Sequence, residues 1–148
     1  MNHTNHILND LVSATRDGKS FYEHAASKVD NPELKTLFTR LAKVKGDIVQ
    51  GLSNEIHAGG DKPADSSTWS GDFNKLYGEV RALLGDKNYA YVSRLEESED
   101  QLLKAFDKAM NDKDTSASAH IVIARILPEV RSCHDIMRAR KIALKKAA

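Results

Sequence analysis

Residues 91–110 carry an apolar stripe at helical spacing, and two glutamates stand on that stripe or beside it. The stripe recurs every three or four residues through Tyr91, Val92, Leu95, Glu99, Leu102, Leu103, Phe106 and Met110. Glu99 lies between leucines one turn before it and one turn after it, and Glu96 precedes it by one turn. A carboxylate buried between helices is costly unless it is paired, hydrogen-bonded or bound to a metal. The fold must therefore bring partners for Glu96 and Glu99 from other segments.

The rest of the chain also has helical periodicity, and the breaks in it predict where the helices end. Asn31 is a good capping residue and Pro32 suits the first helical position, so a two-residue link should separate two antiparallel helices. Pro128 lies inside the last stripe, which continues in phase on both sides, so it should kink that helix without ending it. The expected helices span 5–29, 32–58, 73–84, 88–111 and 115–146.

The connection over residues 59–87 decides the topology. Its first half is rich in glycine, serine and proline, and the short helix 73–84 lies within it. An up-down-up-down bundle would use a short loop here, whereas one long crossover makes the second and third long helices parallel. The sequence therefore predicts an all-α, ferritin-like four-helix bundle, with residues 1–148 as a single domain.

The composition limits the kinds of partner that the protein is expected to bind. The 148 residues are 41% hydrophobic and 29% charged with a net charge of +1, which gives no reason to expect nucleic acid. The longest aliphatic cluster, 121–124, ends at Arg125 and is too short to cross a membrane. Residues 1–10 do not resemble a signal peptide, so we expect a cytoplasmic protein, with homo-oligomerisation left open. The basic residues at the C-terminal end are expected to stabilise the dipole of the last helix. Alternatively, they would bind a partner, and the protein would be an interaction module.

Counting residues from the turns predicts how far along the bundle each side chain lies, and several polar side chains fall at about the same level. Tyr22 and Glu23 lie about 12 Å from the first link, Glu96 lies about 12 Å into its helix, and Glu99 lies about 16 Å in. Matching the last two helices about their turn brings His134 to the same region, pointing into the bundle within reach of Glu96 or Glu99. Carboxylates with an imidazole suit iron, manganese, zinc or another divalent metal. The candidate metal ligands are therefore Glu96, Glu99, His134, Tyr22 and Glu23.

A structural interpretation competes with this metal site. Di-iron bundles use two Glu-x-x-His motifs, and this chain contains none. Lys45 lies near the matching depth of the second helix, where it would be a counter-ion in a network with Tyr22 and His134. The leading hypothesis is a structural or stress-associated bundle without an intact di-iron site, with enzymatic activity left undecided. The alternative is a metal-binding protein, holding iron or a related ion, that reacts with oxygen or peroxide.

Several motifs also carry a resemblance over about residues 5–140. They are Leu8-Asn9-Asp10-Leu11, Asp17-Gly18-x-x-x-Tyr22-x-x-Ala25-Ala26, Asn31-Pro32-Glu33-Leu34, Glu96-x-x-Glu99-Asp100 and His134-Asp135. In this combination the chain resembles a bacterial family of ferritin-like four-helix-bundle proteins of unknown function. The resemblance implies a ferritin-like fold without a settled activity, and it places Tyr22, Glu96, Glu99 and His134 at recurring polar positions. The chain departs from the family in the crossover, where Asn74-Lys75 replaces His-Arg.

Overall fold

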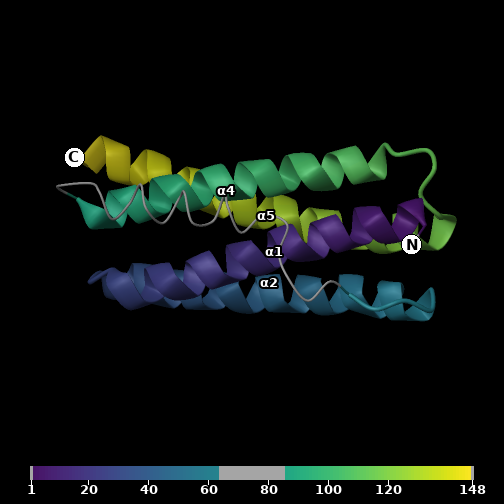
Figure 1. The fold of residues 1–148 in the computed structure, drawn as a ribbon. Helices are drawn as coiled ribbons and strands as arrows, with labels where there is room; N and C mark the ends of the chain where they lie inside the picture. The colour runs from purple at the N-terminus through teal and green to yellow at the C-terminus, as the bar shows by residue number, and fades with distance from the viewer. Residues whose placement is uncertain (1, 64–85, 148) are drawn as a thin grey trace.

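The computed structural model describes residues 2–63 and 86–147, which fold into four long α-helices (Figure 1). These are α1 (His3–Lys28), α2 (Pro32–Ala58), α4 (Lys87–Met110) and α5 (Ala117–Ala147). Every end of these helices lies within two residues of its expected position. The short helix expected at 73–84 lies outside the described residues.

Capping side chains fix where the helices begin. The Asn31 side chain accepts a hydrogen bond from the Leu34 N–H at 3.1 Å, with Pro32 in the first turn of α2. Asp86 accepts the Tyr89 N–H in the same way at the start of α4. These bonds satisfy amide groups that have no partner inside the helix. Gly60, with a positive φ of 83°, lies just beyond α2 and turns the chain away from it.

The helices form two antiparallel pairs, α1 with α2 and α4 with α5 (Figure 1). The pairs stack so that α1 also packs against α4 and α2 against α5. In Figure 1, α2 and α4 run in the same direction, so α2 ends at one end of the bundle and α4 begins at the other. The parallel order expected from the long connection is thus confirmed. α5 continues through Pro128 as one helix, also as expected.

The apolar core of the described residues is divided into two clusters. One, around Phe38, Leu95 and Met137, lies toward the α1–α2 link. The other, around Leu8, Leu52 and Phe106, lies toward the opposite end. Lys45 and Glu99 are buried at the level between them. The polar level predicted from the interrupted stripe is therefore a real feature of the core.

Among the helices that the structure describes, none is long and apolar enough to cross a lipid bilayer.

Candidate functional site

Glu99 of α4 is the centre of the buried polar level. Its side chain is 2% exposed, and its Oε1 accepts a charge-assisted hydrogen bond from Lys45 Nζ of α2 at 2.5 Å. Its Oε2 accepts a hydrogen bond from the Tyr22 hydroxyl of α1 at 2.6 Å. Both oxygens of the buried carboxylate are thus paired with protein donors, and the Lys45 ammonium balances its charge.

The helices around this pair leave room for the long Lys45 side chain. Gly18 of α1 faces it, and a Cβ at Gly18 would lie 4.0 Å from Lys45 Cε. The Tyr22 ring packs at a tilt against Phe38, with 6.0 Å between ring centroids, which holds the hydroxyl toward Glu99. Lys45 itself is 1% exposed, so the ammonium reaches its partner without access to solvent.

Cys133 brings the fourth helix to the same level. Burial raises the pKa of the Cys133 thiol to about 11, an effect that Lys45 opposes and Glu99 reinforces. Burial, followed by the Glu99 charge and hydrogen bond, raises the pKa of Tyr22 well above its ordinary value of 10.0. Both groups therefore stay protonated at neutral pH, so Tyr22 is a donor and Cys133 a buried thiol rather than a thiolate.

His134 lies in a second polar group, between α4 and α5. It is buried, and its Nε2 is 3.7 Å from Glu96 Oε2 and 3.5 Å from Asp100 Oδ1. Its Nδ1 lies 3.1 Å from Asp135 Oδ1. Nε2 has no hydrogen-bond partner although it is shielded from solvent. The expectation that His134 points into the bundle within reach of Glu96 is confirmed.

The structure thus divides the residues predicted from sequence among three places. Tyr22 and Glu99 meet in the central level, while Glu96 and His134 meet beside it. Glu96 is only partly buried, since its side chain is 14% exposed and its Oε1 accepts a bond from Lys141 at 3.3 Å. Glu23 lies on the exposed surface of α1, paired with Lys19 of the same helix, apart from both groups.

Asp100 is absent from the set predicted from sequence. The sequence feature that could have revealed Asp100 is its spacing of four residues from Glu96, because this spacing places the two carboxylates on the same face of one helix. Lys45 was expected as a counter-ion, and its ion pair with Glu99 confirms that role.

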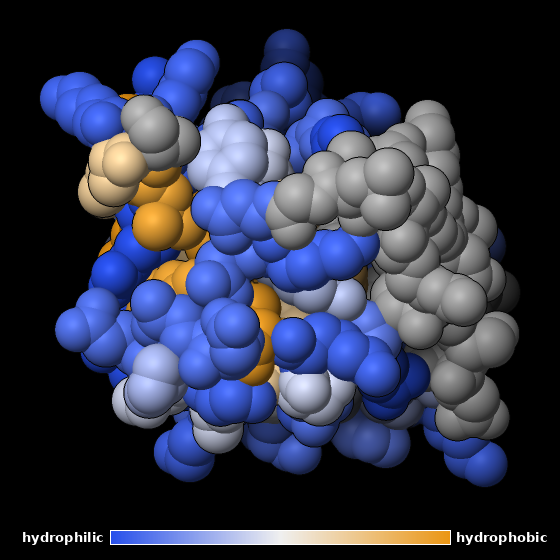
Figure 2. Space-filling view, turned by 90° about the vertical axis from the view of Figure 1, so that its left-hand side faces the viewer, coloured by the Kyte–Doolittle hydropathy of each residue, from blue (hydrophilic) through white to orange (hydrophobic). Residues whose placement is uncertain are grey.

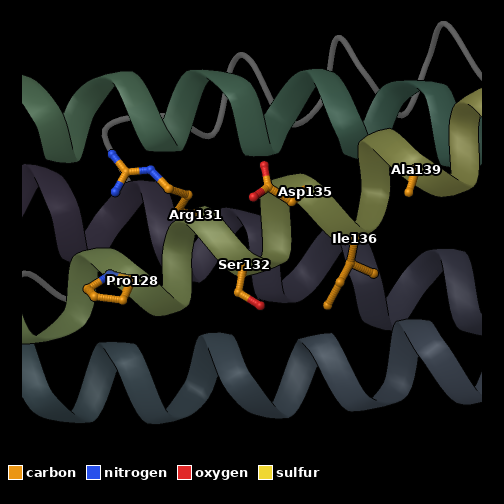
Figure 3. Close-up of a pocket in the computed structure, with 6 residues that line it drawn as sticks. All are labelled: Pro128, Arg131, Ser132, Asp135, Ile136 and Ala139. Atoms are coloured by element: carbon orange, nitrogen blue, oxygen red, sulfur yellow. The ribbon is translucent and has the colours of Figure 1, made fainter.

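A hollow on the outer surface of α5 lies next to the second group (Figure 3). All of its lining residues come from α5, among them Arg131, Ser132, Asp135 and Ile136. Figure 3 shows Arg131 and Asp135 pointing toward α4, while Ser132 and Ile136 point toward α2. Asp135 therefore lies on the side of α5 that faces α4, where the second polar group lies.

The basic C-terminal end of α5 is partly neutralised within the bundle. Arg140 lies 3.5 Å from Glu33 of α2, and Lys141 pairs with Glu96 of α4. Figure 2 looks onto this end of the molecule, where most of the visible surface is hydrophilic and the hydrophobic colour gathers on one side. Ile142, in the last turns of α5, is 45% exposed. The ion pairs of Arg140 and Lys141 therefore connect the end of α5 to α2 and α4.

Comparison with known proteins assigns the family without assigning an activity. No curated protein matches the chain. A family model matches residues 3–112, which is well over half of the chain and includes α1, α2 and α4. The matched region holds Tyr22, Lys45, Glu96, Glu99 and Asp100, whereas Cys133 and His134 lie beyond it. The chain therefore belongs to the family described as "Domain of unknown function (DUF2383)".

Proposed function

We propose that this protein is a ferritin-like bundle with a structural, non-enzymatic role, in which Lys45 is the cation that balances the central carboxylate. The ferritin-like assignment is supported by two antiparallel helix pairs, the single long connection and the parallel course of α2 and α4 (Figure 1). In di-iron bundles of this topology, the central carboxylates face metal ions.

The observation that carries the proposal is the environment of Glu99. One of its oxygens bonds Lys45 Nζ at 2.5 Å and the other bonds the Tyr22 hydroxyl at 2.6 Å. A carboxylate ligand needs its oxygens directed at the metal, and a buried ammonium beside it would repel a dication. The residues at the centre of this bundle therefore do not fit a di-iron site.

A structural role also follows from where the pair lies. Tyr22, Lys45, Glu99 and Cys133 come from four different helices and meet between the two apolar clusters. A buried polar contact of this kind favours one alignment of the helices, because a shifted alignment leaves a charge without a partner. We propose that this cluster sets the register of the bundle.

Anaerobic titration of ferrous iron, followed by exposure to oxygen, tests the proposal. Wild-type protein and the Glu99→Gln variant are expected to take up the same amount of iron and to consume oxygen equally slowly. Lys43→Met, an exposed change on the same helix as Lys45, is the control for loss of a positive charge. Iron uptake with rapid oxygen or peroxide consumption that Glu99→Gln abolishes would overturn the proposal and establish the metal-binding alternative.

A further inference from the structure

The outward face of α5 carries apolar side chains where a surface helix normally carries polar ones. Among the described residues, the exposed large hydrophobic side chains are those of Ile121 and Ile142, which are 59% and 45% exposed. Both lie on α5, and exposed residues of the same helix continue the line between them. We call this line the outer stripe of α5, and its residues are Ile121, Ala124, Pro128, Asp135, Ala139 and Ile142. A largely apolar line along one helix face points to a partner, whereas scattered apolar residues do not.

The spacing of the outer stripe is the same from either end. Its successive members are 3, 4, 7, 4 and 3 residues apart. At about 100° per residue, all of them fall within about 30° of one line along the helix. The residue types are also nearly symmetric, with isoleucine at both ends and alanine next to each isoleucine. A face with this symmetry is complementary to a second copy of itself turned end to end.

We propose that two copies of this protein associate through the outer stripe of α5, with the two helices antiparallel about a two-fold axis. The symmetry of the stripe places that axis at its midpoint, as a closed dimer with one self-complementary surface requires. Ile121 of each copy then lies level with Ile142 of the other copy, and Ala124 lies level with Ala139. The small alanine side chains allow the two helices to pack closely between the isoleucines.

The charged residues near the axis are complementary in this arrangement. Arg131 and Asp135 both point toward the α4 side of α5 (Figure 3). A two-fold axis perpendicular to both helices brings that same side together in the two copies. Arg131 of one copy then lies about three residues, or about 4.5 Å along the helix, from Asp135 of the other copy. Two ion pairs of opposite charge therefore form across the axis.

Both charged side chains keep the capacity for this contact. Arg131 lies 3.6 Å from Asp107 of α4, and these side chains are 52% and 47% exposed, so that ion pair is weak. The Asp135 side chain is 68% exposed and uses Oδ1 to contact His134. A carboxylate has two oxygens that each accept more than one hydrogen bond, and a guanidinium has five N–H donors. Contacts between the copies therefore add to the contacts within each copy.

A hollow in the same face gives the second copy a place to pack. It is lined by residues of α5 between 128 and 139, among them Ser132 and Ile136 (Figure 3). In the antiparallel arrangement, Pro128 of the other copy lies level with Asp135, within the length of the hollow. Its ring displaces water from a partly apolar surface, which favours association. None of the buried residues around Glu99 takes part, so this inference is independent of the proposed structural role.

Sedimentation velocity of the full-length protein over a range of concentrations tests the association. One helix face is smaller than the roughly 800 Å² per partner of a standard interface, so we expect a dimer with a Kd of about 10 to 100 µM. Ile121→Lys and Ile142→Lys should each weaken dimerisation at least tenfold, because each places a charge in the apolar contact. Gln101→Lys, an exposed change on α4 that adds the same charge, should leave dimerisation unchanged.

Cysteine crosslinking tests the direction of the two helices. For helix axes about 9 Å apart, the Cα atoms of Ile121 and of Ile142 in the other copy lie about 5 to 6 Å apart, within disulfide range. Ile121→Cys and Ile142→Cys proteins, both in a Cys133→Ala background, are mixed and oxidised. Antiparallel pairing should join one protein of each kind, whereas parallel pairing would join two proteins of the same kind.

Charge reversal tests the ion pairs across the axis. Arg131→Glu should weaken dimerisation at least tenfold, because it gathers four carboxylates there, and adding Asp135→Arg should largely restore it. These positions are exposed, and circular dichroism checks that each variant is folded. The inference is overturned if wild type stays monomeric up to about 1 mM, far above the expected Kd. It is equally overturned if Ile121→Lys and Ile142→Lys dimerise like wild type, or if crosslinks join proteins of the same kind.

Discussion

Lys45→Met is expected to destabilise the bundle by about 3 to 5 kcal/mol, because it leaves a buried carboxylate without its counter-ion. The Lys45 and Glu99 side chains are 1% and 2% exposed, so water cannot replace the ammonium. Methionine has a similar length and flexibility, and it should fill the space without a large cavity. The Tyr22 hydroxyl remains as the one hydrogen-bond donor to Glu99 that the structure identifies besides Lys45. The loss should therefore come from electrostatics rather than from packing.

The double variant separates these two causes. Adding Glu99→Gln to Lys45→Met removes the stranded charge and keeps an oxygen that can accept the Tyr22 hydrogen bond. The remaining cost is a buried amide NH2 group whose two N–H donors have lost the acceptor geometry of the wild-type pair, about 1 to 3 kcal/mol. The double variant should thus be about 2 kcal/mol more stable than Lys45→Met alone, the difference between those two costs.

Urea unfolding at neutral pH measures these free energies for wild type, both single variants and the double variant. Lys43→Met, on the exposed side of α2, is the matched control and should change stability by less than about 0.5 kcal/mol. If Lys45→Met behaves like Lys43→Met, or if the two single losses simply add in the double variant, then the buried pair is not coupled and the reasoning fails.

Three further changes test other parts of the structure. The pKa of Cys133 rises from 9.0 to about 11 on folding, so the unfolded chain loses that proton first; stability should fall by about 2 to 3 kcal/mol between these pH values. Urea unfolding across this pH range should show a smaller fall in the free energy of unfolding for Cys133→Ala than for wild type. An equal fall would contradict the idea that Cys133 causes this pH dependence. Gly18→Ala should stabilise α1 by about 1 kcal/mol in thermal unfolding, because the new Cβ would make an ordinary contact 4.0 Å from Lys45 Cε. A loss of stability would mean that the lysine needs that space. Asn31→Ala should cost about 1 kcal/mol by removing the cap of α2, and an unchanged melting temperature would argue against that cap.

The helices could be predicted because their signals are local. Asn31 followed by Pro32 marks the start of α2, and Gly59 with Gly60 marks its end, and each acts through backbone groups within one turn. The parallel order of α2 and α4 follows from the length of one connection. Depth along the bundle was also predictable, because each residue advances a helix by about 1.5 Å.

The direction in which each polar side chain points could not be predicted in the same way. Successive residues of a helix turn by about 100°, so with Glu99 facing the centre, Glu96 lies about 60° and Asp100 about 100° to the same side. Depth alone places Glu96 and Glu99 in one group, whereas this rotation separates them. Which neighbour lies on that side depends on how the two helix pairs are stacked, and no local signal in the sequence reports it. In the structure the neighbour is α5, so Glu96 and Asp100 meet His134 there. Glu99 instead pairs with Lys45 and Tyr22. The polar residues that were expected to form one site therefore form two groups with different chemistry.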